Sequence, residues 1–544
     1  MKRNFKFIPS FLVKRCPESG RIVKFRFDNI YARIAFPILG ILAIIWFLVR
    51  VIPKPSRVAY PCQQAAAGIG GSFLIYLVSI VSSLKVYQQI SKRVNKPVAL
   101  AFIASVALIV SLTFVEAKSK KDEFIPVLTN PEGANNPMGE AKGMFPGRVA
   151  WTQDFNATSW DEKTGSWWDD NNTNQGEVNK MMSTNLQALT AAKTDKEAWD
   201  NLFMYNNKLN GRGKRGYTKG EKIVVKLNLN AIGKSDFECK SQGYPSPHMI
   251  YALVSQLIEV AGVAGEDILL ADPSRFMSKP LVDKIRSNSS TDFQNVVYEE
   301  KTPRGEKGFV GAEPDSINGL VWFTMPDGKR FRMCFPKSFS QASYMINYSV
   351  VRPHRVFGIT SVAKNHFGSV WCFELNTFNP KTLHAFAQWD YPTPNKLKDP
   401  HSAPVLLGHK ITNSKTILYL ADGLYAAENQ GLDVKRMSSF DNDWFSSLLM
   451  SQDPVALESV VYDFISNEPN LVMQNPSFNG QQDNQFQECA LANNPASGTK
   501  YDPENNGTPL KSLGVHEHWN NAKDRKYSRN LGKKKGIELV SVKL

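Results

Sequence analysis

The chain has 544 residues, 42% of them hydrophobic, which is enough to bury at least one large core and to form two or three domains. Its formal net charge is +15, but residues 1–122 hold 19 Lys and Arg against 4 Asp and Glu, so they carry the whole excess. Residues 123–544 therefore have no net charge, which argues against a nucleic-acid partner. A Walker loop and the GxSxG, HExxH and CxxC motifs are absent, so any chemistry is built from scattered residues.

Three apolar segments near the N-terminus predict membrane-spanning helices. They cover residues 34–52, 65–84 and 98–115, and each is long enough to cross a bilayer as a helix. The alternative is a buried hairpin of soluble helices. The N-terminal tail and the loop after the second span carry thirteen Lys and Arg, against six on the opposite side. This asymmetry predicts a cytoplasmic tail, and three crossings then place the rest of the chain outside the cytoplasm.

The next part of the chain changes from a linker to a folded domain. Residues 118–147 are polar and rich in Pro and Gly, and the folded domain is predicted to begin at Arg148. Four tryptophans then lie in polar surroundings: Trp151, Trp160, Trp167 and Trp168. Such a cluster is either a sugar-binding platform or, more commonly, the packing of an irregular segment. Residues 176–192 follow with the apolar spacing of an amphipathic helix.

From residue 221 the pattern is that of an α/β domain. Residues 222–227 (KIVVKL) predict a strand, and Ser246 followed by Pro247 predicts the start of a helix. Residues 268–271 predict the next strand, which ends in Asp272. This strand–helix–strand order is typical of a parallel sheet. Residues 319–335 alternate around Asp327-Gly328 and predict a hairpin.

The same pattern recurs further along the chain. Residues 342–351 and 415–421 predict two more strands, and residues 446–450 predict a third before a helix that Asp453 and Pro454 open. After residue 467 the composition predicts an ordered extension with little regular structure. The predicted organisation is a three-helix transmembrane anchor (1–117), a linker (118–147), an α/β domain with a mainly parallel sheet and helices on both faces (148–466), and a polar extension (467–544).

Polar residues that follow the predicted strands are the candidate site, because ligands of open α/β sheets bind beyond the carboxyl ends of the strands. Lysine, arginine and asparagine side chains suit a phosphate or carboxylate ligand, and those at strand ends are Lys226, Asn228, Asn230, Arg352 and Asn365. Carboxylates suit a divalent ion such as Mg²⁺ or Ca²⁺, and the candidates are Asp272, Asp422, Glu428 and Asp453. His354 or His366 is the candidate general acid or base, and His354 and Lys364 are the residues selected as catalytic.

Each candidate also has a purely structural interpretation. Asp272 and Asp453 precede proline and suit helix caps, Asp422 suits a turn, and Lys364 suits a solvated surface. His516 and His518 would share one face of an extended segment and form a further candidate metal pair. The six cysteines lack metal-ligand spacing, and the last four are either buried thiols or hold one disulfide.

Taken together, these segments resemble the domain of unknown function 362 family. The residues that carry the resemblance are Lys226-Leu227-Asn228, Val260-Ala261-Gly262, His354, Gly358-Ile359-Thr360, Lys364-Asn365, Gly368, Asp422-Gly423, Glu428-Asn429 and Asp453-Pro454-Val455-Ala456. They span about residues 220–465. The tail and anchor resemble membrane-anchored members from Bacteroidetes-type bacteria.

The resemblance implies an α/β domain that faces the bacterial cell envelope, on the periplasmic side of the inner (cytoplasmic) membrane, but it supplies no established reaction. Many members carry cysteine runs for iron–sulfur clusters, and this chain lacks them, so no such cluster is expected. Glu458 stands where other members often have a second aspartate.

The resulting hypothesis is a membrane-anchored protein with a polar cleft for an anionic small molecule, working as a metal-assisted enzyme. It requires Lys226, His354, Lys364, Asp422 and Asp453 to approach one another. The alternative is a membrane-tethered module that binds an anionic ligand or glycan without catalysis. A third interpretation is a structural envelope component, in which the same residues only cap helices and form turns.

Overall fold

The computed structural model describes residues 133–229, 242–324, 330–354, 357–373, 376–378, 383, 402–429, 432–472 and 484–544, together with two short strands near the N-terminus. The chain divides into two compact units, Met1–Phe124 and Ile125–Leu544. In the first unit, β1 (Val13–Arg15) pairs antiparallel with β2 (Ile22–Phe25). The three predicted spans lie outside the described residues. Among the helices that are described, none is long and apolar enough to cross a membrane.

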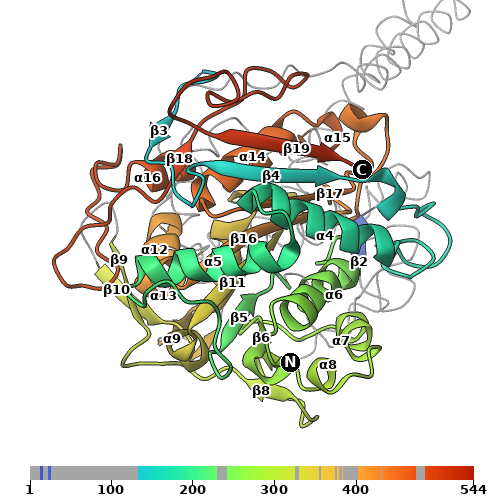
Figure 1. The fold of residues 1–544 in the computed structure, drawn as a ribbon, viewed down its shortest axis with the longest axis horizontal. Helices are drawn as coiled ribbons and strands as arrows, with labels where there is room; N and C mark the ends of the chain where they lie inside the picture. Colours follow the sequence, from blue (N-terminus) through green and yellow to red (C-terminus); the bar gives the residue numbers. More distant parts are fainter. Residues whose placement is uncertain are drawn as a thin grey trace, which may run out of the picture. The chain divides into compact units, whose positions relative to one another are not determined.

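The second unit is built on one large sheet, which Figure 1 shows with β19 at the top and β8 at the bottom. Within the described residues it has nine strands, in the order β19 (Glu538–Lys543), β4 (Arg148–Gln153), β17 (Ser447–Ser451), β16 (Thr416–Gly423), β11 (Tyr344–Val350), β5 (Ile223–Lys226), β6 (Ile268–Ala271), β7 (Val297–Glu300) and β8 (Phe309–Gly311). β17 pairs antiparallel with both of its neighbours, and the other pairings in this sheet are parallel. The prediction of a mainly parallel sheet is therefore confirmed.

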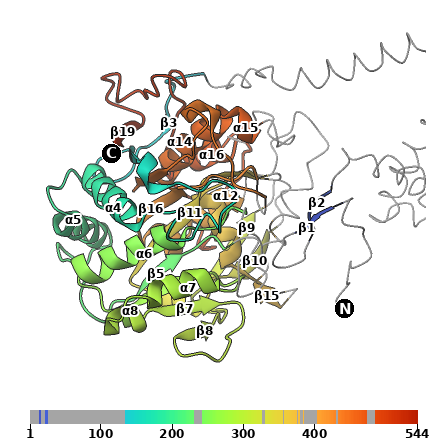
Figure 2. The ribbon, with the colours of Figure 1, turned by 90° about the vertical axis from the view of Figure 1, so that its right-hand side faces the viewer.

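Helices cover both faces of the sheet, as Figure 2 shows. One face packs against α4 (Gln175–Thr190), α5 (Asp195–Leu209), α6 (Pro247–Ser255), α7 (Lys279–Arg286) and α8 (Thr291–Gln294). The other packs against α9 (Lys337–Gln341), α10 (Val362–Asn365), α12 (Ser402–Gly408), α13 (Lys410–Asn413), α14 (Pro454–Ser466), α15 (Pro469–Val472) and α16 (Asn484–Ala490). The central strands are buried on both sides, which explains their nearly continuous apolar sequences. Alternate residues feed opposite cores: Val224 faces the α14 side and Val225 the α6 side.

A smaller sheet lies on the α14 side of the large one. Its order is β15 (Thr377–Phe378), β14 (Trp371–Cys372), β10 (Arg330–Cys334) and β9 (Leu320–Thr324). The antiparallel pairing of β9 with β10 confirms the predicted hairpin. Two further pairs join β12 (Arg352–His354) to β13 (Gly358–Thr360) and β18 (Val515–His516) to β3 (Met138–Gly139).

Local sequence signals placed several helix starts correctly. The Ser246 side chain accepts a hydrogen bond from the Met249 N–H, and Pro247 is the first residue of α6. Two features depend on pairing between distant segments and differ from the expectation. β17 runs against its neighbours, and the C-terminal extension supplies a full edge strand, β19, parallel to β4. The extension therefore contains more regular structure than its composition predicts.

The tryptophan cluster is part of the core. Trp151, Trp160 and Trp167 are each at most 3% exposed. The Trp151 indole N–H donates to Ser447 Oγ at 2.9 Å, and Trp160 stacks on Trp444 with ring centroids 5.8 Å apart. These three rings therefore pack the core, and they are too deeply buried to form a sugar-binding platform. Cys334, Cys372 and Cys489 are buried and form no disulfide among the described residues, while Cys239 lies outside those residues.

Asp453 joins three segments of the second unit. As the N-cap of α14, its carboxylate accepts hydrogen bonds from the backbone N–H groups of Val455 and Ala456, at 3.0 and 2.9 Å. It also accepts the N–H of Lys142 at 2.8 Å and the N–H of Val515 at 3.1 Å. Burial raises the pKa of this carboxyl group to about 7, while the backbone donors favour its charged form.

Removing this carboxylate is predicted to cost much more than removing an ordinary helix cap. In Asp453→Ala the buried N–H groups lose their acceptor, and each unsatisfied group costs about 1–3 kcal/mol, so the free energy of unfolding should fall by at least about 3 kcal/mol. Thr194→Ala is the matched control, because Thr194 caps α5 through one hydrogen bond to the Glu197 N–H and should cost about 1 kcal/mol. Urea unfolding of the full-length protein measures both. Equal losses would contradict the joining role of Asp453.

Candidate functional site

A group of charged side chains lies at the carboxyl ends of three neighbouring parallel strands. Lys226 is the last residue of β5, and Asp272 directly follows β6. The Lys226 ammonium lies 3.4 Å from Asp272 Oδ2 and donates to Asn365 Oδ1 at 2.9 Å. It also donates to the Leu227 carbonyl oxygen. We call Lys226, Asp272, Arg352, Lys364 and Asn365 the strand-end cluster.

Asn365 fastens α10 to the sheet. Its side-chain amide donates toward the Lys226 carbonyl at 2.9 Å, the Asn347 Oδ1 at 2.8 Å and the Tyr348 carbonyl at 2.9 Å. Lys226 and Asn347 are register partners on β5 and β11, so a single asparagine bridges both strands. The neighbouring Lys364 is therefore held at a fixed position over the strand ends.

Gly368 allows the segment after α10 to approach the cluster closely. A Cβ at this position would lie 2.8 Å from Ser274 Oγ, 3.0 Å from Asp272 Oδ1 and 3.6 Å from Lys226 Nζ. Ser274 in turn donates from both its N–H and its hydroxyl to Asp272 Oδ1. The absence of a side chain at Gly368 therefore matters for packing against the cluster.

Arg352 adds a third cation on the neighbouring hairpin. Its guanidinium is 1% exposed and donates to Asn228 Oδ1 at 2.7 Å and to the Gly243 carbonyl at 2.9 Å. Burial lowers the pKa of Arg352 to about 10, so the group stays charged at neutral pH. Asn228 thus orients an arginine in this structure.

Lys364 is the most perturbed amine of the cluster. It is 6% exposed, and its ammonium lies 4.3 Å from the centre of the Phe367 ring. Burial lowers its pKa well below the usual value, and repulsion from Arg275, Arg352 and Lys226 lowers it further, while Asp272 opposes the shift. Burial also lowers the pKa of Lys226, where Asp272 again opposes the change. The cluster therefore holds more positive charge than its carboxylate balances.

His366 lies beside these amines. Its Nδ1 is 3.1 Å from Ser369 Oγ, and burial together with Lys226 lowers its pKa to about 3. The ring is therefore neutral across the physiological pH range. The sequence offers His354 as the alternative general acid or base, and it is the one selected. In the structure the His354 Nδ1 accepts the Phe357 N–H at 3.0 Å, between β12 and β13.

Three of the four predicted metal ligands lie away from the cluster. Asp422 lies on the opposite, α6 face of the sheet and accepts hydrogen bonds from the Ser246 N–H and the Tyr348 hydroxyl at 2.8 and 2.6 Å. Burial raises its pKa. Glu428 forms an ion pair with Lys435 at 3.3 Å. Asp453 follows β17, which runs antiparallel to β16, so it lies on the side of the sheet where the parallel strands begin.

The expected convergence therefore holds for Lys226, Asp272, Arg352, Lys364 and Asn365 but not for Asp422, Glu428 or Asp453. Asn230 lies outside the described residues. In the part of the chain that is described, no three His, Cys, Asp or Glu residues are grouped to hold a metal ion. His516 and His518 contact Ser459 Oγ at 2.8 Å and Asp463 Oδ1 at 2.6 Å, respectively.

Sequence reasoning missed Asn347. It lies in β11, a strand that is buried along its whole length, and its amide also donates to the Val362 carbonyl at 2.9 Å. A polar side chain inside an otherwise buried strand is the signal that would have identified it, because a buried amide needs hydrogen-bonding partners.

The strand-end cluster lies within a segment that matches a known family model. Residues 223–463 match the family model described as Domain of unknown function (DUF362). We call these residues the DUF362 segment, and they contain the whole strand-end cluster. The predicted resemblance is confirmed for this segment, while the membrane-anchored subgroup stays a prediction.

The lactate racemase apoprotein from Thermoanaerobacterium thermosaccharolyticum is among the similar solved structures, with 12% sequence identity and a TM-score of 0.27. The similarity covers 61% of this chain and 62% of that chain, so it spans less than two thirds of the racemase. No curated protein matches the sequence.

Filling the space at Gly368 is predicted to disturb the cluster. In Gly368→Ala the new methyl group displaces Ser274 from Asp272, and overpacking of this kind costs about 1–3 kcal/mol. Gly216→Ala is the control, because its Cβ would meet Asp200 Oδ1 at an ordinary 3.8 Å. Thermal unfolding of both variants measures the effect. A Gly368→Ala protein as stable as Gly216→Ala would show that the close approach has no energetic consequence.

Proposed function

We propose that the DUF362 segment binds a small molecule with a phosphate or carboxylate group at the strand-end cluster and uses Lys364 as an acid or base on it. The observation that carries this proposal is the excess of buried positive charge in the cluster. Lys226, Arg352 and Lys364 are all at least nine-tenths buried, and Asp272 is the carboxylate that acts on both lysines. A bound anion would balance this excess and supply acceptors for the donors.

The lowered pKa of Lys364 supports its part in the proposal. A lowered pKa makes a lysine release its proton more readily, and the neutral amine is also a nucleophile. Lys226 is held by Asn365, Asp272 and the Leu227 carbonyl, whereas no hydrogen bond from the Lys364 ammonium to a described residue is present. Lys226 and Arg352 therefore suit a binding role, and Lys364 suits the reactive role.

The remaining parts of the hypothesis stay predictions from the sequence. The divalent ion is one of these predictions: in the structure Asp272 pairs with Lys226 and accepts hydrogen bonds from Leu229 and Ser274. Asp422, Glu428 and Asp453 are engaged elsewhere. We also infer from the sequence that three N-terminal spans anchor the protein in a bacterial inner membrane with the DUF362 segment on the periplasmic side. Binding without catalysis is the alternative, and it would use the same cationic cluster.

Sulfate is a suitable probe of the cluster, because its charge is constant between pH 5 and 9. Its binding needs the protonated form of Lys364, whose pKa is lowered in the free protein. Affinity is therefore predicted to fall as the pH rises through that pKa, by up to about tenfold per pH unit. Isothermal titration calorimetry in buffers of different ionisation enthalpy should also detect proton uptake on binding.

Variants of Lys364 separate this effect from general electrostatics. Lys364→Met should weaken sulfate binding by about tenfold or more, since one charge-assisted contact is lost. Lys364→Arg keeps the charge and should flatten the pH dependence, because arginine does not titrate in this range. Lys219→Met changes an exposed lysine and should leave binding unchanged. Sulfate binding that is equally strong in Lys364→Met and the wild type would overturn the proposal.

A further inference from the structure

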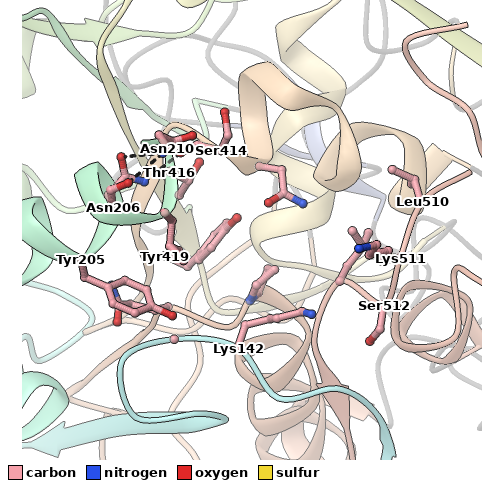
Figure 3. Close-up of a pocket in the computed structure, with 16 residues that line it drawn as sticks. Lys142, Tyr205, Asn206, Asn210, Ser414, Thr416, Tyr419, Leu510, Lys511 and Ser512 are labelled. Carbon is pink, nitrogen blue, oxygen red and sulfur yellow. Dashed lines mark hydrogen bonds between the residues drawn. The ribbon is translucent and has the colours of Figure 1, made fainter. Parts of the chain in front are cut away.

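A polar pocket lies on the side of the large sheet where its parallel strands begin, away from the strand-end cluster. Figure 3 shows this pocket, which has a volume of about 410 Å³, within the range of small-molecule sites. It opens where β16 begins and where β17 ends, between the C-terminal end of α5 and the N-terminal end of α14. None of the residues that line it belongs to the strand-end cluster.

The lining has a distinctive chemical composition. It contains Lys142 and Lys511 but neither aspartate nor glutamate, so its formal charge is positive. Four side-chain amides and three serine or threonine hydroxyls supply further donors and acceptors, namely those of Asn206, Asn210, Asn413, Gln452, Ser414, Thr416 and Ser512. Tyr205 and Tyr419 present aromatic rings on one side of the pocket, and the two lysines lie on the other (Figure 3).

The walls are fixed by hydrogen bonds within the protein. Two hydrogen bonds hold the loop that carries Lys142. The Lys142 N–H donates to Asp453 Oδ2 at 2.8 Å, and the Met144 N–H donates to Gln452 Oε1 at 2.9 Å. Gly143 adopts φ +98°, and a Cβ there would lie 3.0 Å from the Cβ of Gln452. Ser512 is held by the Glu140 N–H at 2.8 Å. A pocket with fixed walls loses little conformational entropy when it binds a ligand.

Several polar groups at the pocket keep bonding capacity for a ligand. Asn206 and Asn210 use their amide N–H groups on the Ser414 carbonyl, both at 2.8 Å. Within the described residues, by contrast, no hydrogen bond engages Gln452 Nε2, the Asn413 side chain or the Lys511 ammonium. The Lys142 ammonium pairs with Glu140 at 3.3 Å, but that pair is solvent-exposed and therefore weak.

We propose that this pocket is a second ligand site, for a small anion that carries several hydroxyl groups, such as a sugar phosphate. The two lysines bind the anionic group, the amides and hydroxyls bind the sugar hydroxyls, and the tyrosine rings pack against the apolar face of the sugar. The site is independent of the function proposed above, because it shares no residue with the strand-end cluster. Its existence does not require that cluster to bind anything.

Three probes test the class of ligand by calorimetry on the full-length protein. Glucose 6-phosphate combines both chemical features, while glucose and inorganic phosphate carry one each. We expect glucose 6-phosphate to bind about tenfold or more tightly than either of the others. Because phosphate also suits the strand-end cluster, only binding that the Lys142→Met and Lys511→Met double variant weakens is assigned to this pocket. Phosphate that binds this pocket as tightly as glucose 6-phosphate would overturn the sugar part of the proposal, and the absence of any binding at about 10 mM would overturn it entirely.

Variants then locate the binding. The double variant Lys142→Met and Lys511→Met should weaken glucose 6-phosphate binding at least about tenfold, and Asn413→Trp should block the pocket from an exposed position. Lys523→Met is the control at an exposed lysine outside the lining. Lys364→Met should leave this binding unchanged, and loss of binding in Lys364→Met alone would assign the ligand to the strand-end cluster and overturn the proposal. Unfolding temperatures within about 2 °C of the wild type confirm that each variant is folded.

Discussion

The hydrogen bond from the Lys226 ammonium to Asn365 Oδ1 is the contact on which the strand-end cluster depends. It joins the last residue of a central strand to α10, across a separation of 139 positions in the chain. Burying a lysine is costly unless its charge is paired and its donors are satisfied. Asn365 and Asp272 meet that need, and Asn365 also ties β5 to β11 through Asn347 and Tyr348. The same contacts that stabilise the strand ends therefore fix the position of Lys364.

That arrangement separates two cations that suit binding from a reactive one. Lys226 and Arg352 donate hydrogen bonds to the side-chain oxygens of Asn365 and Asn228, so part of their cost of burial is met inside the fold. Lys364 instead lies over an aromatic ring and near three other cations, and its pKa falls accordingly. A folded protein tolerates such a group either by releasing its proton or by binding an anion, and these two responses are what an acid–base group needs.

The sequence was sufficient for features that are local. The strands β5 and β6 and the cap of α6 follow from short apolar runs and from Ser246-Pro247, and the structure has them at the expected positions. Five of the polar residues selected at strand ends lie together in the structure and three do not, because local pattern cannot tell a binding group from a structural one. Asp422 and Lys226 both end strands, yet Asp422 meets Tyr348 and the start of α6, while Lys226 meets Asn365. The partner, which is distant in sequence, decides the role.

The direction of β17 explains why Asp453 does not join the strand-end cluster. The expectation that Asp453 would join the cluster assumed that all strands point the same way. Because β17 is antiparallel to β16, its carboxyl end lies beside the amino end of β16. Asp453 therefore lies on the side of the sheet away from the strand-end cluster. There its carboxylate accepts hydrogen bonds from the loop that bears Lys142 and from the start of α14. Both segments line the polar pocket that contains Lys142 and Lys511. One reversed strand thus divides the polar residues between the two sides of the sheet where strands begin and end. Each of these sides acquires an excess of positive charge that a small anion can balance.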